Sequence, residues 1–365
     1  MKKISYALFA TMSLMACSPK PPKAQLFLPS DAAHFAISGR TDLKDSTLVL
    51  ISAASKIAFT PESKDTVIAM FKNDQAQNHS FIALAINKQY QKRIRIDSDT
   101  INHIAIPLSK TDTLVELYKA TEASTGNVLF AGVKTKSLAT APKKPSTKIE
   151  FVGNSITSGF GNDHKEYPCG SAGWFDAHNA FFSYATLSAN ELNADFVLSS
   201  VSGWGMYRNW DVNGPTIPDV YDNLYLNTDS TKHYTAANFK PELVSICLGT
   251  NDLSGGDGVH ERLPFSKEDF TTAYIKFVAH VIATRNNPKI AILDSPMVSG
   301  ENKAILDECL TSVANYFKAK GKVIHVFNFD RIPETGCGGH PAIKEDMMMA
   351  KQLEPFLQNI LKGKE

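Results

Sequence analysis

The second half of the chain contains short apolar runs that alternate with segments of helical periodicity, and this alternation limits the possible folds most. The runs cover residues 149–152, 196–198, 243–248, 290–293 and 323–327. Helical patterns lie between and after them, at residues 181–192, 266–285, 302–320 and 343–361. Unbroken apolar runs are typical of parallel strands that are buried on both faces. The pattern therefore predicts a doubly wound α/β domain with a parallel sheet over residues 148–365.

The preceding region, residues 34–136, has a different pattern. Short apolar or alternating runs are separated there by clusters of Ser, Asn, Asp and Lys, and no helical period of useful length interrupts them. Such runs are typical of an all-β sandwich. Residues 137–147 are polar and contain two prolines, so we expect a linker and a domain boundary there.

The N-terminus has the features of an export signal. Lys2 and Lys3 precede an apolar stretch, residues 4–16, that is too short to span a bilayer. The sequence Leu-Met-Ala-Cys that ends at Cys17 resembles the bacterial lipobox, in which the cysteine is lipid-modified. We therefore predict a lipoprotein signal peptide over residues 1–17, with Cys17 lipidated, although plain signal cleavage with an incidental thiol is the alternative.

Residues 18–33 begin with a Pro- and Lys-rich stretch that suits a solvated tether. Ser18 follows the cysteine, which in a Gram-negative bacterium favours the outer membrane. The sequence thus predicts an exported, membrane-anchored lipoprotein, at the outer membrane or facing the periplasm.

Charge and metal-binding spacing exclude several functional classes. Without Lys2 and Lys3, the only charged residues before Cys17, the formal net charge changes from +1 to −1. The sequence contains no basic patch of the kind that would indicate a nucleic-acid partner. Three histidines are candidates for metal ligands: His164, His178 and His280. They lack a metal-ligand spacing such as His-x-x-x-His, so we expect neither a metal site nor a zinc deacetylase.

Export would permit disulfides, but the cysteines are too few for a disulfide scaffold. Four cysteines follow the tether: Cys169, Cys247, Cys309 and Cys337. Cys247 lies inside an apolar run and is expected to be buried. A bridge between Cys309 and Cys337 is one candidate pairing.

Four polar or small residues follow the predicted parallel strands. Ser155 follows the first strand, Gly203 the second, Asn251 the third, and His340 the loop after the fifth. Sites in such sheets form beyond the carboxyl ends of the strands, so these residues converge on one edge. Acyl transfer by a serine needs a base and donors for the developing oxyanion. We predict Ser155 as nucleophile and His340 as base, with the main-chain N–H groups of Ser155 and Gly203 and the Asn251 amide as oxyanion donors.

Each of these residues also has an ordinary structural explanation. Ser155 suits a helix N-cap, Asn251 suits a bond to its own loop, and a glycine suits a turn. Gly205 is a rival to Gly203 as the donor. The four residues together, at four strand ends, favour catalysis.

Short motifs surround these residues and resemble the four blocks of the SGNH (GDSL-type) hydrolases. The motifs are Gly153-Asn-Ser-Ile-Thr157, Ser202-Gly203, Gly249-Thr-Asn-Asp252 and His340-Pro341. The resemblance implies the same roles for Ser155, Gly203, Asn251 and His340, and it implies no cofactor.

Longer stretches resemble carbohydrate esterase family 2. They are residues 148–161, 202–209 and 336–341, together with Gly39-Arg40, residues 117–122 and residues 130–132 in the β region. This resemblance implies a jelly-roll-like N-terminal domain packed beside the site. It also implies an acetylated polysaccharide or oligosaccharide as substrate, of the xylan or glucomannan type, from which O-acetyl groups are removed.

The sequence departs from the family pattern at two places. Asn154 replaces the usual Asp before the nucleophile, which we expect to be tolerated. The Asp expected two or three residues before His340 is absent. Either a backbone carbonyl near His340 completes a Ser-His dyad, or Asp330 or Glu334 supplies a carboxylate; we favour the dyad because loop carboxylates are usually solvated.

Aromatic residues are frequent in the long segment between the second and third parallel strands. Flat apolar faces with a polar end suit sugar rings, so three of them are candidates for substrate contacts: Trp204, Tyr207 and Trp210. Two other functions stay open. One is a non-catalytic glycan-binding surface lipoprotein with a decayed site, and the other is an esterase acting on lipid or peptidoglycan acetyl esters.

Overall fold

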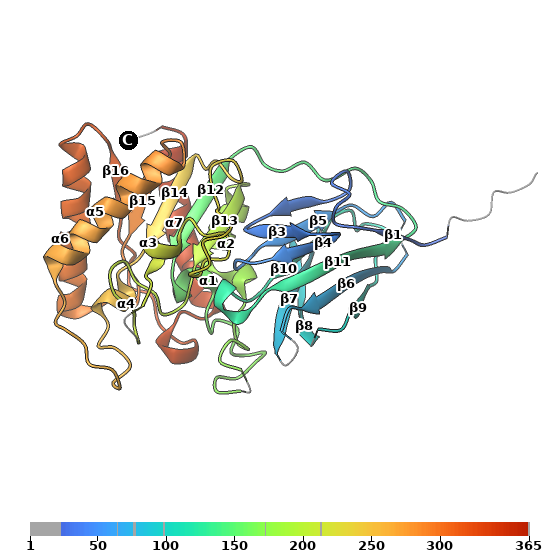
Figure 1. The fold of residues 1–365 in the computed structure, drawn as a ribbon, viewed down its shortest axis with the longest axis horizontal. Helices are drawn as coiled ribbons and strands as arrows, with labels where there is room; N and C mark the ends of the chain where they lie inside the picture. The colour runs from blue at the N-terminus through green and yellow to red at the C-terminus, as the bar shows by residue number, and fades with distance from the viewer. Residues whose placement is uncertain are drawn as a thin grey trace, which may run out of the picture.

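Antiparallel sheets occupy one end of the molecule, and a parallel sheet flanked by helices occupies the other, in the computed structural model (Figure 1). The structure describes residues 23–63, 65–75, 78–97, 99–171, 173–211 and 214–363. The predicted lipidation site, Cys17, therefore lies outside the described residues. Within these ranges no helix combines the length and the apolar character needed to cross a membrane.

The N-terminal region is a sandwich of two antiparallel sheets, as predicted. One sheet has the order β3-β4-β11-β6-β9, with β1 paired to β11. Its strands are β1 (Gln25–Phe27), β3 (Thr41–Lys44), β4 (Thr47–Leu50), β6 (Val67–Asn73), β9 (Asn102–Ile106) and β11 (Val128–Thr135). The other sheet has the order β2-β5-β10-β7-β8. Its strands are β2 (Ala36–Ser38), β5 (Lys56–Phe59), β7 (His79–Ile86), β8 (Gln89–Asp97) and β10 (Val115–Lys119). Buried aliphatic and phenylalanine side chains from both sheets form the core between them.

The C-terminal region has five parallel strands in the order β13-β12-β14-β15-β16, which confirms the predicted doubly wound sheet. The strands are β12 (Lys148–Gly153), β13 (Asp195–Ser200), β14 (Leu243–Cys247), β15 (Lys289–Leu293) and β16 (Ile324–Phe327). The chain runs outward in both directions from β12, so the end of β12 is where the strand order reverses. Ligands bind at such a point in open α/β sheets.

Long helices cover both faces of this sheet. Alternate strand residues pack against α2 (Tyr184–Glu191) and α7 (Ile343–Leu361) on one face. The other face packs against α5 (Lys267–Thr284) and α6 (Gly300–Lys318). Short helical turns complete the fold at the sheet edge and in the loops: η1 (Ala123–Thr125), α1 (Ser155–Ser158), η2 (Ala180–Phe182), α3 (Ile217–Val220), α4 (Thr250–Leu253) and η3 (Cys337–Gly339).

A fully buried guanidinium, that of Arg40, joins the two regions. It donates to the main-chain oxygens of Tyr221 and Asn223, at 2.8 and 2.9 Å, and to the hydroxyl of Ser199 at 2.9 Å. Its Nη2 lies 3.6 Å from a carboxylate oxygen of Glu150, which is also fully buried on β12. Burial lowers the pKa of Arg40, and the Glu150 charge opposes this.

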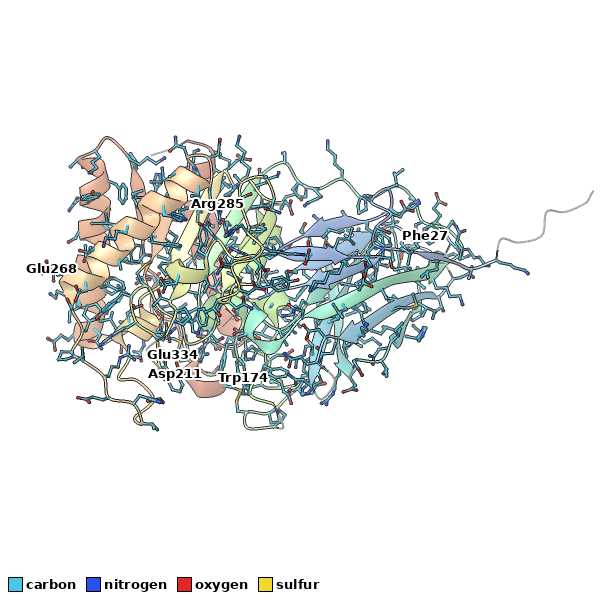
Figure 2. All side chains as sticks on the ribbon, in the orientation of Figure 1. Phe27, Trp174, Asp211, Glu268, Arg285 and Glu334 are labelled. Atoms are coloured by element: carbon cyan, nitrogen blue, oxygen red, sulfur yellow. A yellow bond between two sulfur atoms is a disulfide. The ribbon has the colours of Figure 1, made fainter. Side chains whose placement is uncertain are left out.

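The same carboxylate has further partners within the C-terminal region. Arg285, labelled in Figure 2, places its Nε 3.4 Å from Glu150, and the Tyr221 hydroxyl donates to Glu150 at 2.8 Å. A buried charge is tolerated only where partners replace its hydration. The network therefore fixes how the sandwich sits on the parallel sheet.

We expect Arg40→Ala to lower the free energy of unfolding by about 3–5 kcal/mol, because it leaves Glu150 and two main-chain oxygens short of a buried partner. Denaturant-induced unfolding would measure this loss. Arg95→Ala is the matched control: Arg95 pairs with Asp97 at 2.6 Å, but both side chains are solvent-exposed, so we expect a change of about 0–1 kcal/mol. Equal losses in the two variants would contradict the role given to Arg40.

Candidate active site

Ser155 is the first residue of α1 and directly follows the turn at the end of β12. Asn154 is the N-cap, and its side-chain oxygen accepts from the Ile156 N–H at 3.3 Å. The Asn in place of the family's Asp thus has a capping role, which either side chain can fill. Gly153 is required by crowding, because a Cβ there would lie 2.1 Å from the Thr157 hydroxyl oxygen. The local sequence therefore places Ser155 at the edge of the sheet.

His340 lies beside Ser155, as predicted. Its Nε2 is 2.8 Å from the Ser155 Oγ, and its Nδ1 is 3.1 and 3.2 Å from the main-chain oxygens of Cys337 and Gly338. A carbonyl oxygen can only accept, so Nδ1 carries the proton and Nε2 is free to accept from the serine hydroxyl. The tautomer is the one that a general base for Ser155 needs.

Both partners of Nδ1 are carbonyl oxygens, which is the arrangement expected for a dyad. Asp330 is exposed, and its own main-chain N–H donates to Gln352. Glu334, labelled in Figure 2, is also exposed. The position that a triad carboxylate would take behind the histidine is held by the Cys337–Gly339 turn, η3.

A disulfide joins Cys169 to Cys337 across 168 residues of sequence. The suggested pairing of Cys309 with Cys337 is wrong, because Cys309 lies on the buried face of α6 in the core and is a free thiol. Cys247 is buried as expected. The Cys337 N–H also donates to the Gly161 oxygen at 3.0 Å. Covalent and hydrogen-bonded contacts thus hold the turn that presents its carbonyl oxygen to His340.

Phe160 covers one face of His340, with ring centroids 4.3 Å apart and an interplanar angle of 32°. The same ring contacts His178, which is fully buried. Burial lowers the pKa of His178 well below its ordinary value, and the neighbouring His340 lowers it further, so His178 is neutral. The stack restricts the orientation of the His340 ring without adding a charge.

Gly203 is a better placed oxyanion donor than Gly205. The Gly205 N–H already donates to the Asn209 side chain at 3.2 Å, and a Cβ at this position would lie 2.1 Å from the Arg208 oxygen. Gly203 instead borders the same cavity as Ser155. The Asn251 amide donates to the Trp204 oxygen at 2.8 Å, and a second N–H remains on the same nitrogen.

The buried carboxylate of Asp252 braces these loops. It accepts from the main-chain N–H groups of Met206, Tyr207 and Arg208 at 2.9–3.2 Å. Burial raises the pKa of Asp252, and the three N–H groups oppose this. Because Asn251 and Asp252 are adjacent, the contact fixes the Asn251 loop against the segment that follows Gly203.

A cavity of about 760 Å³ contains the four residues predicted from the strand ends: Ser155, Gly203, Asn251 and His340. Apolar side chains line much of the rest, including Phe160, Leu253, Met297 and Val298. Ser124 of η1 also lines it, so the N-terminal region contributes to the wall. Within the described part of the chain, no group of three or more His, Cys, Asp or Glu side chains is placed to hold a metal ion.

The three aromatic candidates for substrate contacts differ in their position relative to this cavity. Trp210 lines the cavity and is 45% exposed. Trp204 faces a different groove, and Tyr207 packs against Phe265 and Phe270, so neither lines the cavity. Trp174, which the sequence analysis missed, lines the cavity and is 54% exposed; Figure 2 labels it. It lies in an irregular loop after Cys169, where no periodicity marks an aromatic residue as exposed.

Comparisons with known families agree with this architecture. Residues 151–330 match the GDSL-like Lipase/Acylhydrolase family, and residues 37–145 match the carbohydrate esterase 2 N-terminal domain. The chain is 28% identical over 252 residues to an acetylxylan esterase / glucomannan deacetylase of Cellvibrio japonicus, covering 67% of this chain and 68% of that protein. It is 33% identical over 254 residues to the cellulase/esterase CelE of Acetivibrio thermocellus, covering 67% of this chain and 30% of that protein.

Solved structures share the whole fold. A family two carbohydrate esterase from Clostridium thermocellum, in complex with cellohexaose, superposes with a TM-score of 0.78 at 24% identity, covering 90% of this chain and 99% of that one. A family two carbohydrate esterase from Cellvibrio japonicus gives a TM-score of 0.80 at 20% identity, covering 93% and 98%. The sandwich and the parallel sheet therefore occur together in these structures.

If His340 is the base, activity should follow its neutral form. Burial lowers the pKa of His340 below its ordinary value of 6.5, while the two carbonyl contacts oppose the shift. The neutral form is lost as the pH falls through this pKa, so we expect the acidic limb of kcat/KM to have its midpoint below pH 6.5. The pH dependence of aryl acetate hydrolysis would measure it. A midpoint above pH 6.5 would indicate a carboxylate partner for the histidine.

Proposed function

We propose that this carboxylic ester hydrolase, which combines a GDSL-like lipase/acylhydrolase domain with the carbohydrate esterase 2 N-terminal domain, removes O-acetyl groups from a polysaccharide. The observation that carries this proposal is the 2.8 Å contact between His340 Nε2 and Ser155 Oγ inside a cavity. The relatives named acetylxylan esterase / glucomannan deacetylase support the substrate class.

In the proposed mechanism, the Ser155 oxygen attacks the acetyl carbonyl carbon and His340 Nε2 takes the hydroxyl proton. The carbonyl oxygen becomes an oxyanion, which accepts from the N–H groups of Ser155 and Gly203 and from the Asn251 amide. When the intermediate collapses, the bond to the sugar oxygen breaks and His340 returns the proton to that oxygen. The acetyl group is left on Ser155.

Water completes the cycle. His340 takes a proton from a water molecule, which attacks the acetyl-serine carbonyl through the same oxyanion site. The bond between the carbonyl carbon and the Ser155 oxygen then breaks, and His340 gives the proton to that oxygen. Acetic acid leaves and ionises to acetate. The main-chain oxygens of Cys337 and Gly338 keep Nδ1 protonated throughout, so the ring always presents Nε2 to the reacting atoms.

The walls of the cavity support a sugar substrate. Trp174 and Trp210 both line it and are about half exposed, so their flat faces are available to a ring outside the acetyl pocket. The polar lining, which includes Asp211 and Asn302, offers acceptors and donors for sugar hydroxyl groups. Together with the relatives named acetylxylan esterase / glucomannan deacetylase, these features favour a xylan or glucomannan acetyl ester as the substrate.

Ser155→Ala should abolish hydrolysis of p-nitrophenyl acetate and acetate release from acetylated xylan or glucomannan. Asn251→Ala should lower kcat by roughly 10²–10³ with little change in KM, because its contact strengthens in the transition state. Asn315→Ala, which alters an exposed residue of α6, is the control and should match the wild type. A wild type no faster than Ser155→Ala, yet able to bind the glycan, would favour the non-catalytic alternative.

We propose that the protein is exported and anchored through Cys17. The signal-like N-terminus and the lipobox resemblance support this. Cys17→Ser should move the protein from the membrane fraction to the soluble fraction or leave its signal uncleaved, as fractionation and mass spectrometry of the N-terminus would reveal. Cys309→Ser, at a cysteine of the folded core, should not change the fractionation. Membrane association that survives Cys17→Ser would contradict the anchor.

A further inference from the structure

Glu122 is a buried carboxylate of the N-terminal region that reaches into the C-terminal one. It lies between β10 and η1, and its side chain is fully buried. Its two carboxylate oxygens lie 3.0 and 3.2 Å from the main-chain nitrogen of Ser202, and one of them also accepts from the Ser202 hydroxyl. Both donors of Ser202 therefore converge on a single carboxylate from the other domain.

Ser202 directly precedes Gly203, whose N–H is a proposed oxyanion donor. That N–H belongs to the peptide group between the two residues, so the position of Ser202 fixes one end of it. The peptide group on the other side, between Gly203 and Trp204, is held as well, because the Gly203 oxygen accepts from the Trp210 N–H at 2.7 Å. The Ser202–Gly203 peptide group therefore lies between two peptide groups that are each fixed by a hydrogen bond.

Gly203 has open space beside its Cα. Its φ is +80°, in the left-handed region that favours glycine, and no atom lies within 4 Å of where a Cβ would be. The hydrogen bonds around the glycine support this conformation: those to Glu122 and Trp210, and the turn bond from the Trp204 N–H to the Val201 oxygen at 3.5 Å.

Glu122 is itself held rigidly. Its main-chain oxygen accepts from the buried Lys119 ammonium and from the Thr125 hydroxyl at 2.8 Å. The same Lys119 donates to the Ile51 oxygen at 2.9 Å, which links this corner to the end of β4. The carboxylate is thus presented from a fixed backbone and not from a mobile loop.

The two oxyanion donors outside Ser155 depend on the same turn. The Asn251 amide donates to the Trp204 oxygen, one residue after Gly203, at 2.8 Å. A shift of the turn would therefore displace both donors together. Asp252 braces the later part of this segment from within the C-terminal domain, and Glu122 braces the earlier part from the N-terminal domain.

We propose that Glu122 is a positioning residue of the oxyanion site, through which the N-terminal domain takes part in ester hydrolysis. The inference rests on the proposed esterase function. Preorganised donors stabilise the oxyanion without reorganisation, and a misplacement of about 1 Å costs about 10²-fold in rate. Glu122 does not touch substrate. Its effect is exerted through the Ser202–Gly203 peptide group.

Three substitutions separate the effect of the length of the Glu122 side chain from the effect of its charge. Glu122→Asp keeps the charge but withdraws the carboxylate by one methylene, so kcat should fall about 10–100-fold, with KM changed no more than about threefold. Glu122→Ala should give a similar loss. Glu122→Gln keeps both the reach and an acceptor for the Ser202 N–H, and should stay within about fivefold of the wild type. The assay is steady-state hydrolysis of p-nitrophenyl acetate.

A second measurement reports on the oxyanion site without turnover. Diethyl p-nitrophenyl phosphate phosphorylates an active serine and places its phosphoryl oxygen where the oxyanion forms. Its inactivation rate constant should fall in the same order as kcat. Asp42→Ala is the matched control: Asp42 is a carboxylate of the N-terminal domain that accepts from Tyr225 and Lys232 across the interface, at 2.7 and 2.6 Å, and does not line the cavity.

Each outcome either supports or overturns the positioning role of Glu122. Loss in Glu122→Asp and Glu122→Ala, with Glu122→Gln and Asp42→Ala close to the wild type, supports the proposal. A Glu122→Asp variant equal to the wild type, a loss confined to KM, or an equal loss in Asp42→Ala overturns it. Thermal unfolding identifies a variant that does not fold, in which case the comparison of Glu122→Gln with Glu122→Asp decides. A wild type no faster than Ser155→Ala would refute the esterase function itself, which is a different result.

Discussion

The buried guanidinium of Arg40 is the interaction on which the arrangement of the two domains depends. A charge with no exposure needs partners in fixed directions, and Arg40 finds them in Glu150, Ser199 and two main-chain oxygens of the C-terminal domain. Apolar packing alone tolerates sliding, whereas these directional contacts do not. Phe81 and Tyr118 of the sandwich extend the same interface into the main core of the parallel sheet. The two domains therefore share part of one hydrophobic core, and η1 is held beside the active site.

The sequence predicted the elements whose pattern depends on burial alone. The five parallel strands and α7 were placed to within two residues, because strands covered on both faces consist mostly of apolar side chains. The site followed from the same pattern, since parallel strands bring their carboxyl ends to one edge. The structure places Ser155, Gly203, Asn251 and His340 around one cavity there, although their catalytic roles stay predictions. Gly39-Arg40 and residues 117–122 belong to the contacts between the domains.

Features that depend on contacts between distant segments of the chain could not be predicted from the local sequence pattern. Strand β8 is an example: it lies at the edge of its sheet and carries exposed charged residues, so its apolar pattern is weak. The partner of Cys337 depends on how the loop around Cys169 folds back, and spacing gives no indication of that. Trp174, Trp204 and Tyr207 show the same limit: exposure of an aromatic side chain is set by neighbours distant in sequence.

The carbonyl partners of His340 stabilise its imidazolium form less than a carboxylate partner would. A carboxylate at Nδ1 would raise the pKa of the histidine and stabilise the imidazolium with a full charge, whereas two carbonyl dipoles do so more weakly. Burial meanwhile lowers the pKa of His340. In the proposed mechanism the base is therefore weaker, and less of the transition-state stabilisation comes from the imidazolium. A larger share must come from the oxyanion contacts, whose strength depends on the placement of Gly203 and Asn251. Hydrogen bonds from both domains converge on the turn that sets this placement, so the proposed oxyanion donors lie on a segment that is held from two directions.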